Sequence, residues 1–208
     1  MASLTCPITT AAARRDARKA LLEARRAMPD AVRRAADAAI RARLAGLLAA
    51  RAWPLAGRII AAYWPMQGEP DPRPLFADWV AAGATLALPV VVGRGEPLRF
   101  ARHAPGALLR AGAHGTVEPA GGEWLAPDVV IVPCVGFGDA GWRLGYGGGY
   151  YDRTLAGLAA ITVGIAYEEG GLPGLRPEPH DVALGFVVTQ ERLVDCERIR
   201  RVRPGGRR

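Results

Sequence analysis

Residues 129–155 read VVIVPCVGFGDAGWRLGYGGGYYDRTL. The unbroken apolar run at residues 129–132 predicts a strand buried on both faces of a sheet, because a strand with one wet face would alternate apolar and polar side chains. A glycine-rich loop follows, and a helical pattern then extends from about Tyr150 to Leu158. This order of strand, loop and helix predicts an α/β fold whose ligands bind beyond the carboxyl ends of the strands.

The regions on either side repeat the alternation of strand and helix. Short apolar runs predict further strands at residues 58–63 (RIIAAY), 85–89 (TLALP), 161–167 and 186–189, with residues 98–102 as a hairpin or edge strand. Apolar stripes at helical spacing predict helices at residues 14–28, from 30 to about 53, and at 74–82. We therefore predict an α/β fold, a three-layer α/β/α single domain with a mainly parallel central sheet.

The two ends of the chain are predicted to lie outside this domain. Residues 1–13 are small and polar, and we expect them to form a disordered extension. The domain itself is expected to span residues 14–195. Residues 196–208 form a basic tail, and we expect its part from Arg198 to Arg208 to be solvated and disordered.

The charge distribution limits the classes of function. The 208-residue chain has a formal net charge of +7 at pH 7, with the positive charge concentrated at both ends and a mildly acidic middle. A nucleic-acid-binding protein can have this pattern, and so can an enzyme whose basic helix holds phosphates or carboxylates. The chain lacks a helix-turn-helix pattern and aromatic residues interleaved with basic ones, so we expect no specific nucleic-acid partner.

Cysteine spacing and hydropathy point to a cytoplasmic protein. Cys6, Cys134 and Cys196 are widely separated and form no Cys-x-x-Cys pair, so neither a disulfide framework nor a zinc site is predicted. The chain contains no signal-peptide pattern and no run of about 18 apolar residues that could span a membrane. We expect a cytoplasmic monomer that acts on a small molecule.

The first predicted helix carries arginines along one side. Arg14, Arg18 and Arg25 are spaced by four and seven residues, which places them on a narrow arc beside the apolar stripe. Such an arc can bind phosphates, but arginines on a helix are more often a solvated face. The helix alone does not decide between these alternatives.

The glycine-rich loop is the strongest local signal for a binding site. Glycines allow backbone N–H groups to approach an anion closely, and the start of the following helix favours negative charge. The loop is not a P-loop, because GxxxxGK[ST] is absent. Asp152 follows it directly and could hold Mg²⁺ or cap the helix. The alternative is a tight turn that only packs a helix on the sheet.

Residues 129–155 closely resemble the signature of the 5-formyltetrahydrofolate cyclo-ligase family, also called 5,10-methenyltetrahydrofolate synthetases. Three other segments agree with the family in order and spacing: the basic helix at residues 14–28, IAAYWPMQGEPD at residues 60–71, and ITVGIAY with EPHD and FVVT between residues 161 and 189. The resemblance implies an ATP- and Mg²⁺-dependent ligase of folate and one-carbon metabolism. Its expected reaction closes the ring of 5,10-methenyltetrahydrofolate from 5-formyltetrahydrofolate.

The resemblance also implies roles for individual residues. Arg14 and Arg18 match the family's contacts to ATP phosphates, and Asp152 and Asp181 match its pair of Mg²⁺ ligands. The expected ATP loop comprises Arg143, Gly145, Tyr146, Gly147, Gly148, Gly149, Tyr150 and Tyr151. Of these, the residues from Tyr146 to Tyr150 are also expected to border the folate. Arg143, Tyr151 and Asp152 are the expected catalytic residues, and Trp64 and Glu69 the expected pterin contacts.

The sequence departs from the family pattern in three places. Gly148 stands where the loop commonly has a lysine, which removes one phosphate contact that Arg143 or Arg153 could replace. Gly170 stands where a glutamine is usual, and an acid common near Gly185 is missing. These departures motivate an alternative function: a divergent member that keeps the nucleotide site but acts on another substrate. A nucleic-acid-binding protein is the less favoured third hypothesis.

Overall fold

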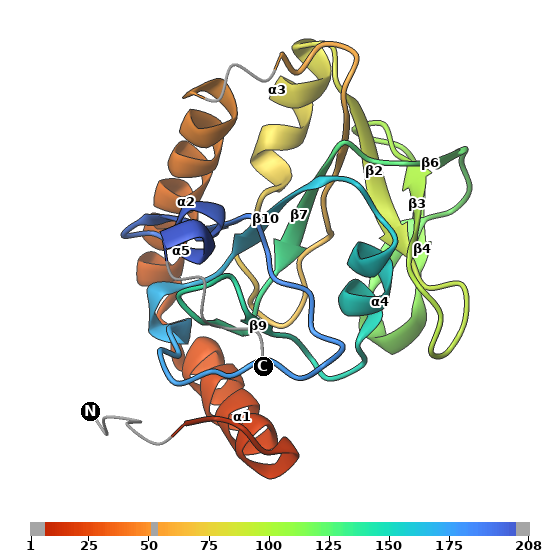
Figure 1. Cartoon of the computed structure of the whole chain (residues 1–208). Helices are drawn as coiled ribbons and strands as arrows, with labels where there is room; N and C mark the ends of the chain where they lie inside the picture. Colours follow the sequence, from red (N-terminus) through yellow and green to blue (C-terminus); the bar gives the residue numbers. More distant parts are fainter. Residues whose placement is uncertain (1–6, 51–53, 203–208) are drawn as a thin grey trace.

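The computed structural model describes residues 7–50 and 54–202. Among these residues an eight-stranded sheet forms the centre of the molecule, in the order β12-β11-β10-β7-β1-β2-β3-β6 (Figure 1). Its parallel strands are β1 (Ile59–Ala61), β2 (Thr85–Val90), β7 (Val129–Pro133), β10 (Ile161–Ile165) and β11 (Phe186–Val188). The antiparallel strands at its two sides are β3 (Arg99–Arg102), β6 (Trp124–Leu125) and β12 (Leu193–Asp195). The predicted mainly parallel sheet is therefore confirmed.

Helices cover both faces of this sheet, as the three-layer prediction requires. Val129 and Ile131 of β7 share a core with α2 (Asp30–Ala50) and α3 (Phe76–Ala81), which follows the 3₁₀ turn η1 (Arg73–Leu75). Val130 and Val132 point to the other face and pack with α4 (Tyr150–Ala156) and α5 (Cys196–Val202). Because successive side chains of a strand alternate between faces, a fully apolar β7 serves both cores.

Helix α1 (Ala11–Ala27) lies beyond the sheet and packs against loops (Figure 1). The Thr10 side chain caps it by accepting a hydrogen bond from the N–H of Ala13. Ile8 is buried and forms an isolated parallel bridge with Leu175. The prediction of a disordered extension through residue 13 is therefore wrong for residues 7–13, because this segment has a backbone partner and a cap. Residues 1–6, including Cys6, lie outside the described residues.

The predicted basic tail also differs at its start. Residues 196–202 form α5, whose first residue, Cys196, is fully buried. The Arg200 guanidinium donates hydrogen bonds to the carbonyl oxygens of Ala140 and Leu184 at 2.7 and 2.9 Å. These contacts anchor the helix on the domain, so a solvated tail was the wrong expectation for this part. Residues 203–208 lie outside the described residues.

Two small antiparallel ribbons were not predicted. The hairpin of β4 (Leu109–Ala111) and β5 (Val117–Pro119) includes the 3₁₀ turn η2 (Ala113–Gly115), and β8 (Gly136–Phe137) pairs with β9 (Arg143–Leu144). A further 3₁₀ turn, η3 (Glu168–Gly170), follows β10. Both ribbons contribute to the cavity described below. In the part of the chain that the structure describes, no helix combines the length and apolarity needed to cross a bilayer.

Candidate active site

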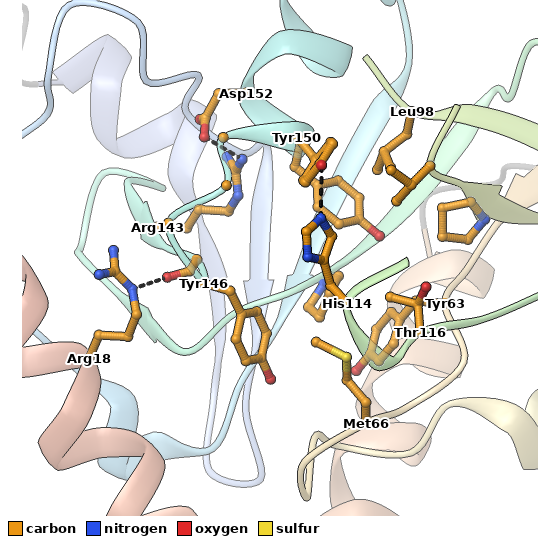
Figure 2. A pocket seen from close by; sticks show the side chains of 18 of the residues that line it. Arg18, Tyr63, Met66, Leu98, His114, Thr116, Arg143, Tyr146, Tyr150 and Asp152 are labelled. Carbon is orange, nitrogen blue, oxygen red and sulfur yellow. Dashed lines mark hydrogen bonds and ion pairs between the residues drawn. The ribbon is translucent and has the colours of Figure 1, made fainter. Parts of the chain in front are cut away.

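A cavity of about 580 Å³ opens at the carboxyl ends of β1, β2 and β7 (Figure 2). Its walls come from α1, the residues after β1, the β4–β5 hairpin, the glycine-rich loop with the start of α4, and residues 178–181. This is the edge at which open parallel sheets bind their ligands. Every residue predicted to bind ATP, folate or Mg²⁺ contributes to its lining, although these residues come from four separate regions of the sequence.

The glycine-rich loop begins with β9 and ends at the first turn of α4. Gly147 and Gly149 adopt left-handed backbone conformations, with φ of 97° and 65°. A side chain at either position would be strained, so these two glycines are required by the shape of the turn. Gly149 precedes α4 as its N-cap residue and offers no side-chain cap. The first residues of α4, Tyr150 to Asp152, line the cavity.

Two arginines of α1 meet this loop and the segment at residues 178–181. The Arg14 guanidinium is buried; it forms an ion pair with the Asp181 carboxylate and lies 3.8 Å from that of Glu178. The Arg18 Nε donates to the Gly145 carbonyl at 2.6 Å (Figure 2). Burial lowers the pKa of Arg18, and the neighbouring charge of Arg14 lowers it further. Arg14 and Arg18 of the predicted arc therefore line the cavity instead of forming a solvated face.

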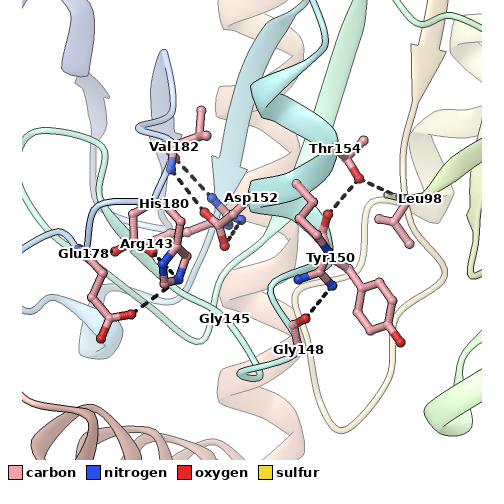
Figure 3. A network of polar contacts seen from close by, with 12 residues as sticks. Leu98, Arg143, Gly145, Gly148, Tyr150, Asp152, Thr154, Glu178, His180 and Val182 are labelled. Carbon is pink, nitrogen blue, oxygen red and sulfur yellow. Dashed lines mark hydrogen bonds and ion pairs between the residues drawn. The ribbon is translucent and has the colours of Figure 1, made fainter. Parts of the chain in front are cut away.

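Asp152 is held by a buried arginine and does not cap α4. One of its carboxylate oxygens forms an ion pair with Arg143 Nη2 at 3.0 Å, and the other accepts a hydrogen bond from the Val182 N–H at 3.2 Å (Figure 3). Arg143 Nη1 donates to the Val182 carbonyl at 3.2 Å, and the Arg143 side chain is only 4% exposed. These contacts connect the glycine-rich loop, α4 and the segment after Asp181.

The second predicted metal ligand lies in a different cluster. One ligand atom from each of Glu178, His180 and Asp181 falls within 4.8 Å of the others, and this group does not include Asp152. Asp181 also accepts a hydrogen bond from the Glu178 N–H at 2.9 Å. The cavity thus offers carboxylate oxygens, the ligand type that Mg²⁺ prefers, and arginines engage both predicted ligands.

The wall after β1 combines aromatic and apolar residues with Gln67 and one buried carboxylate. Glu69 is 5% exposed and accepts a hydrogen bond from the Met66 N–H at 2.9 Å. Burial raises its pKa to about 7, against the opposing effects of the Met66 N–H, the Tyr146 hydroxyl and the Arg25 charge. Tyr63 donates to the Pro70 carbonyl at 2.6 Å, which fixes the same loop. Trp64 is half-buried beside Glu69's loop and also lines the cavity.

The cavity therefore has two unlike ends. We call the part formed by Arg14, Arg18, Arg143, Asp152 and Asp181 the charged end. We call the part formed by Tyr63, Trp64, Glu69 and Tyr146 the aromatic end. Figure 2 shows Tyr146 between the two, with Arg18 on one side and Met66 and Tyr63 on the other. Tyr151 is half-buried at the base of α4, 5.9 Å from the Arg143 guanidinium, and burial raises its pKa far above the usual range.

Sequence reasoning missed the contribution of the β4–β5 hairpin. His114 and Thr116 from its turn line the cavity, and the His114 Nε2 lies 3.0 Å from the Tyr150 hydroxyl (Figure 2). His114 itself has a positive φ of 58°. The only sequence signals were a glycine on each side of Ala113–His114, which indicate a turn but not its position over the cavity.

Residues 10–190 match the model of the 5-formyltetrahydrofolate cyclo-ligase family. The chain belongs to this family. The 5-formyltetrahydrofolate cyclo-ligase of Mycolicibacterium smegmatis is 35% identical over 160 residues, which cover 69% of this chain and 81% of the relative. That of Escherichia coli K12 is 33% identical over 144 residues, covering 64% and 79%. A solved structure of the Aquifex aeolicus 5,10-methenyltetrahydrofolate synthetase is similar with a TM-score of 0.74 and 30% identity, covering 88% of this chain and 92% of that one.

Two departures from the usual cyclo-ligase pattern have structural explanations. A Cβ at Gly148 would lie 2.8 Å from the Tyr150 ring, and the Gly148 carbonyl accepts a hydrogen bond from Arg153 Nη2 at 2.7 Å. Gly170 is buried outside the cavity lining, where a Cβ would lie 3.0 Å from the Val135 carbonyl oxygen. A glutamine there would require the backbone next to β8 to move. Its absence therefore removes no side chain from the cavity of this cyclo-ligase family member.

Proposed function

We propose that this chain converts 5-formyltetrahydrofolate to 5,10-methenyltetrahydrofolate with hydrolysis of ATP to ADP and phosphate. The observation that carries the proposal is the presence of both ends in a single cavity: cations and a glycine-rich loop on one side, aromatic rings and a buried carboxylate on the other. A polyanion suits the charged end, because arginines and backbone N–H groups at a helix start attract phosphates. A flat heterocycle with N–H donors suits the aromatic end.

The chemistry requires the two substrates to lie side by side. A formamide is a poor electrophile, so N10 attacks it slowly unless its oxygen becomes a leaving group. Transfer of the γ-phosphoryl group to the formyl oxygen provides that leaving group. N10 then forms the new C–N bond, and phosphate departs with the former formyl oxygen. Because phosphoryl transfer depends mainly on positioning and charge neutralisation, the protein needs no covalent intermediate.

The residues of the charged end have distinct roles in this proposal. Arg14 and Arg18 bind the phosphates, with the loop from Gly145 to Tyr150 around them. Asp152 and Asp181 would hold Mg²⁺, which would neutralise charge on the phosphates. Both carboxylates are paired with arginines, and incoming phosphates offer those arginines an alternative anionic partner. Arg143 forms an ion pair with Asp152, and its guanidinium lies 5.9 Å from the Tyr151 ring. These three residues form the proposed catalytic group.

The aromatic end orients the folate. The Glu69 carboxylate accepts N–H groups of the pterin, and Trp64 and Tyr146 pack against its ring. A buried acceptor left without a donor costs about 1–3 kcal/mol, so a ligand without the matching N–H groups would bind more weakly. Residues from Tyr146 to Tyr150 lie between the two ends and border both substrates in this arrangement.

The test is the appearance of methenyltetrahydrofolate absorbance with purified protein and 5-formyltetrahydrofolate. Product should form only when ATP and Mg²⁺ are both present. If the folded protein binds ATP and yet forms no product, the divergent family member with another substrate is the better hypothesis. We further propose that the protein is a cytoplasmic monomer. The described cysteines Cys134 and Cys196 are unpaired and buried, which agrees with a reducing compartment.

A nucleic-acid-binding function is the weaker candidate. The arginines of α1 that gave the chain its basic start are directed into the cavity, where they contact Asp181 and Gly145. We therefore expect only weak binding to nucleic acid that is lost near physiological salt, as a few phosphate contacts would give. Tight, salt-resistant binding to a defined nucleic acid would overturn this ranking.

A further inference from the structure

Arg25 lies behind the wall of the cavity. It is 5% exposed and does not line the cavity, unlike Arg14 and Arg18 on the same helix. Its guanidinium donates to the Tyr146 hydroxyl at 3.1 Å and to the Cys134 carbonyl at 2.7 Å. Both of these acceptors are uncharged. A buried cation with neutral hydrogen-bond partners is costly unless a negative charge lies close by.

Glu69 supplies that negative charge, through a shared hydroxyl. The Tyr146 hydroxyl accepts a hydrogen bond from Arg25 and is hydrogen-bonded to the Glu69 carboxylate. Burial of Glu69 raises its pKa to about 7, and the charge of Arg25 acts in the opposite direction. The three side chains therefore form a line from α1 through the glycine-rich loop to the loop after β1.

The other ionisable groups around Glu69 do not provide a competing charge. Burial raises the pKa of Tyr63, Tyr146 and Tyr151 well above neutrality and that of Cys134 to about 12, so all four are uncharged at pH 7. Arg33 of α2 is also close, but its guanidinium donates to the backbone carbonyls of Arg25, Met28 and Gly68. Within residues 7–50 and 54–202, Arg25 is the cation that lowers the pKa of Glu69.

We infer that Arg25 is a positioning residue of the aromatic end, which orients the Tyr146 hydroxyl and keeps Glu69 in the charged form that accepts N–H groups of the ligand. The inference rests on the proposed function and extends it. Arg25 touches neither substrate in this arrangement. It acts through Tyr146, so it should govern the affinity for folate and its dependence on pH, and leave the binding of ATP unchanged.

The direct test follows the titration of Glu69 in the protein without ligands. NMR of protein with ¹³C-labelled glutamate carboxyls, assigned with Glu69→Gln, gives the midpoint in the wild type and in Arg25→Met. We expect Arg25→Met to raise the midpoint by about one pH unit, as loss of a nearby opposite charge does, and Arg25→Lys to stay close to the wild type. Arg26→Met removes an exposed arginine of the same helix and is the matched control. Equal midpoints in Arg25→Met and Arg26→Met would overturn the inference.

The second test measures equilibrium binding of 5-formyltetrahydrofolate, without ATP, at pH 7 and pH 9. Arg25→Met should weaken binding about fivefold at pH 7, where Glu69 becomes mostly protonated, and much less at pH 9, where it is again ionised. Arg25→Lys should recover most of the loss. The affinity for ATP should change less than about twofold. An equal loss of folate affinity at both pH values would indicate general distortion and would reject the inferred role.

Two further measurements separate the possible failures. If Arg25→Met does not fold, Tyr146→Phe removes the connecting hydroxyl without leaving a buried charge unpaired, and it should also raise the Glu69 midpoint; an unchanged midpoint there rejects the inference. If the wild type binds no 5-formyltetrahydrofolate, the proposed function fails. The titration of the ligand-free protein still decides whether Arg25 controls the charge of Glu69.

Discussion

The two ends of the cavity handle charge in opposite ways. At the charged end, carboxylates and arginines are in direct contact: Asp152 with Arg143 at 3.0 Å, and Asp181 with Arg14. At the aromatic end, Glu69 has neutral hydrogen-bond partners, and its nearest cation acts from behind a tyrosine hydroxyl.

Because of this difference, we expect ligand binding at the two ends to respond to different solution conditions. Residues in direct ion pairs can exchange partners with an incoming polyanion and metal ion. A buried carboxylate beside neutral groups is instead poised between two protonation states near neutral pH. We therefore expect ligand binding at the charged end to depend mainly on phosphate and metal, and binding at the aromatic end to depend on pH.

The largest effect should come from breaking the buried ion pair between Arg143 and Asp152. Arg143→Met leaves Asp152 without its cation in a site that is only 16% exposed on the carboxylate side, so the free energy of unfolding should fall by about 3 kcal/mol. Urea denaturation monitored by circular dichroism measures this loss.

Arg18→Met is the matched comparison for that loss. Arg18 is half-buried and bonds to a loop carbonyl, so its removal should cost less than about 1 kcal/mol of stability. It should instead raise the KM for ATP by about tenfold. Equal losses of stability in the two variants would mean that the charged end does not divide into structural and ligand-binding arginines.

Glu69→Gln should produce the next largest effect, confined to the aromatic end. A neutral amide replaces a charged acceptor, which at pH 8 should weaken the binding of 5-formyltetrahydrofolate by about 2 kcal/mol, or about 30-fold. Calorimetric titration with the folate and with ATP separates the two ends. Glu96→Gln, at an exposed glutamate away from the cavity, should bind both ligands as the wild type does.

Asp152→Asn tests the metal at the charged end. The amide keeps the shape of the carboxylate and can still accept the Val182 N–H, so folding should survive while Mg²⁺-dependent kcat falls about tenfold, equivalent to about 1.4 kcal/mol. Steady-state kinetics at several Mg²⁺ concentrations measure the loss. Asp139→Asn changes an exposed acid in the turn between β8 and β9, outside the cavity lining, and should be neutral. Full activity of Asp152→Asn would show that this carboxylate is only structural.

The pH dependence of stability offers a finer distinction between the ends. The pKa of Glu69 is raised by folding from 4.5 to about 7, so the unfolded chain loses this proton at lower pH than the folded one. Its contribution to stability is therefore greatest below about pH 4.5 and is lost as the pH rises to about 7. Glu69→Gln should remove this pH-dependent loss of stability. The melting temperature of the variant should therefore rise relative to that of the wild type between pH 5 and pH 8. A constant difference across that range would contradict the raised pKa.

Gly148→Lys should have the smallest effect. The substitution introduces the usual lysine of the family, but the loop already has Arg18 at Gly147 and Arg153 on the Gly148 carbonyl. We expect the KM for ATP to change less than about twofold. A large gain in ATP affinity would show that the native loop is a weakened phosphate site and would favour the divergent-relative alternative.

The parts of the fold that are periodic in sequence could be predicted. The predicted strand at residues 85–89 is observed as Thr85–Val90, and that at residues 129–132 as Val129–Pro133. Such strands can be recognised from a short stretch of sequence, because burial on both faces makes them continuously apolar. The two-residue strands β8 and β9 have no such pattern. Their pairing depends on loops that come together only in the folded chain.

The candidate site was predicted in part for the same reason. The glycine-rich loop and the Arg14–Arg18 pair carry local signals, and both line the cavity. For the metal pair, the structure groups Asp181 with Glu178 and His180 and not with Asp152, because the position of Asp181 relative to α4 depends on how the chain folds. His114 could not be identified, because its place over the cavity results from the β4–β5 hairpin. The sequence places Arg25 on the arc of α1. Its burial behind Tyr146 depends on tertiary contacts, which the sequence pattern does not show.

The separate location of α1 affects how the protein would lose activity when it unfolds in part. Its apolar contacts belong to a small cluster with Ile8, Leu144, Leu172 and Leu175, apart from both cores of the sheet. A helix held by a satellite cluster can detach in a partial opening that leaves the sheet and its other helices intact. Such an opening would remove Arg14, Arg18 and Arg25 together. Catalytic competence would then be lost well before global denaturation, and the lifetime of the closed helix, rather than the overall folding free energy, would set the useful working range of this enzyme.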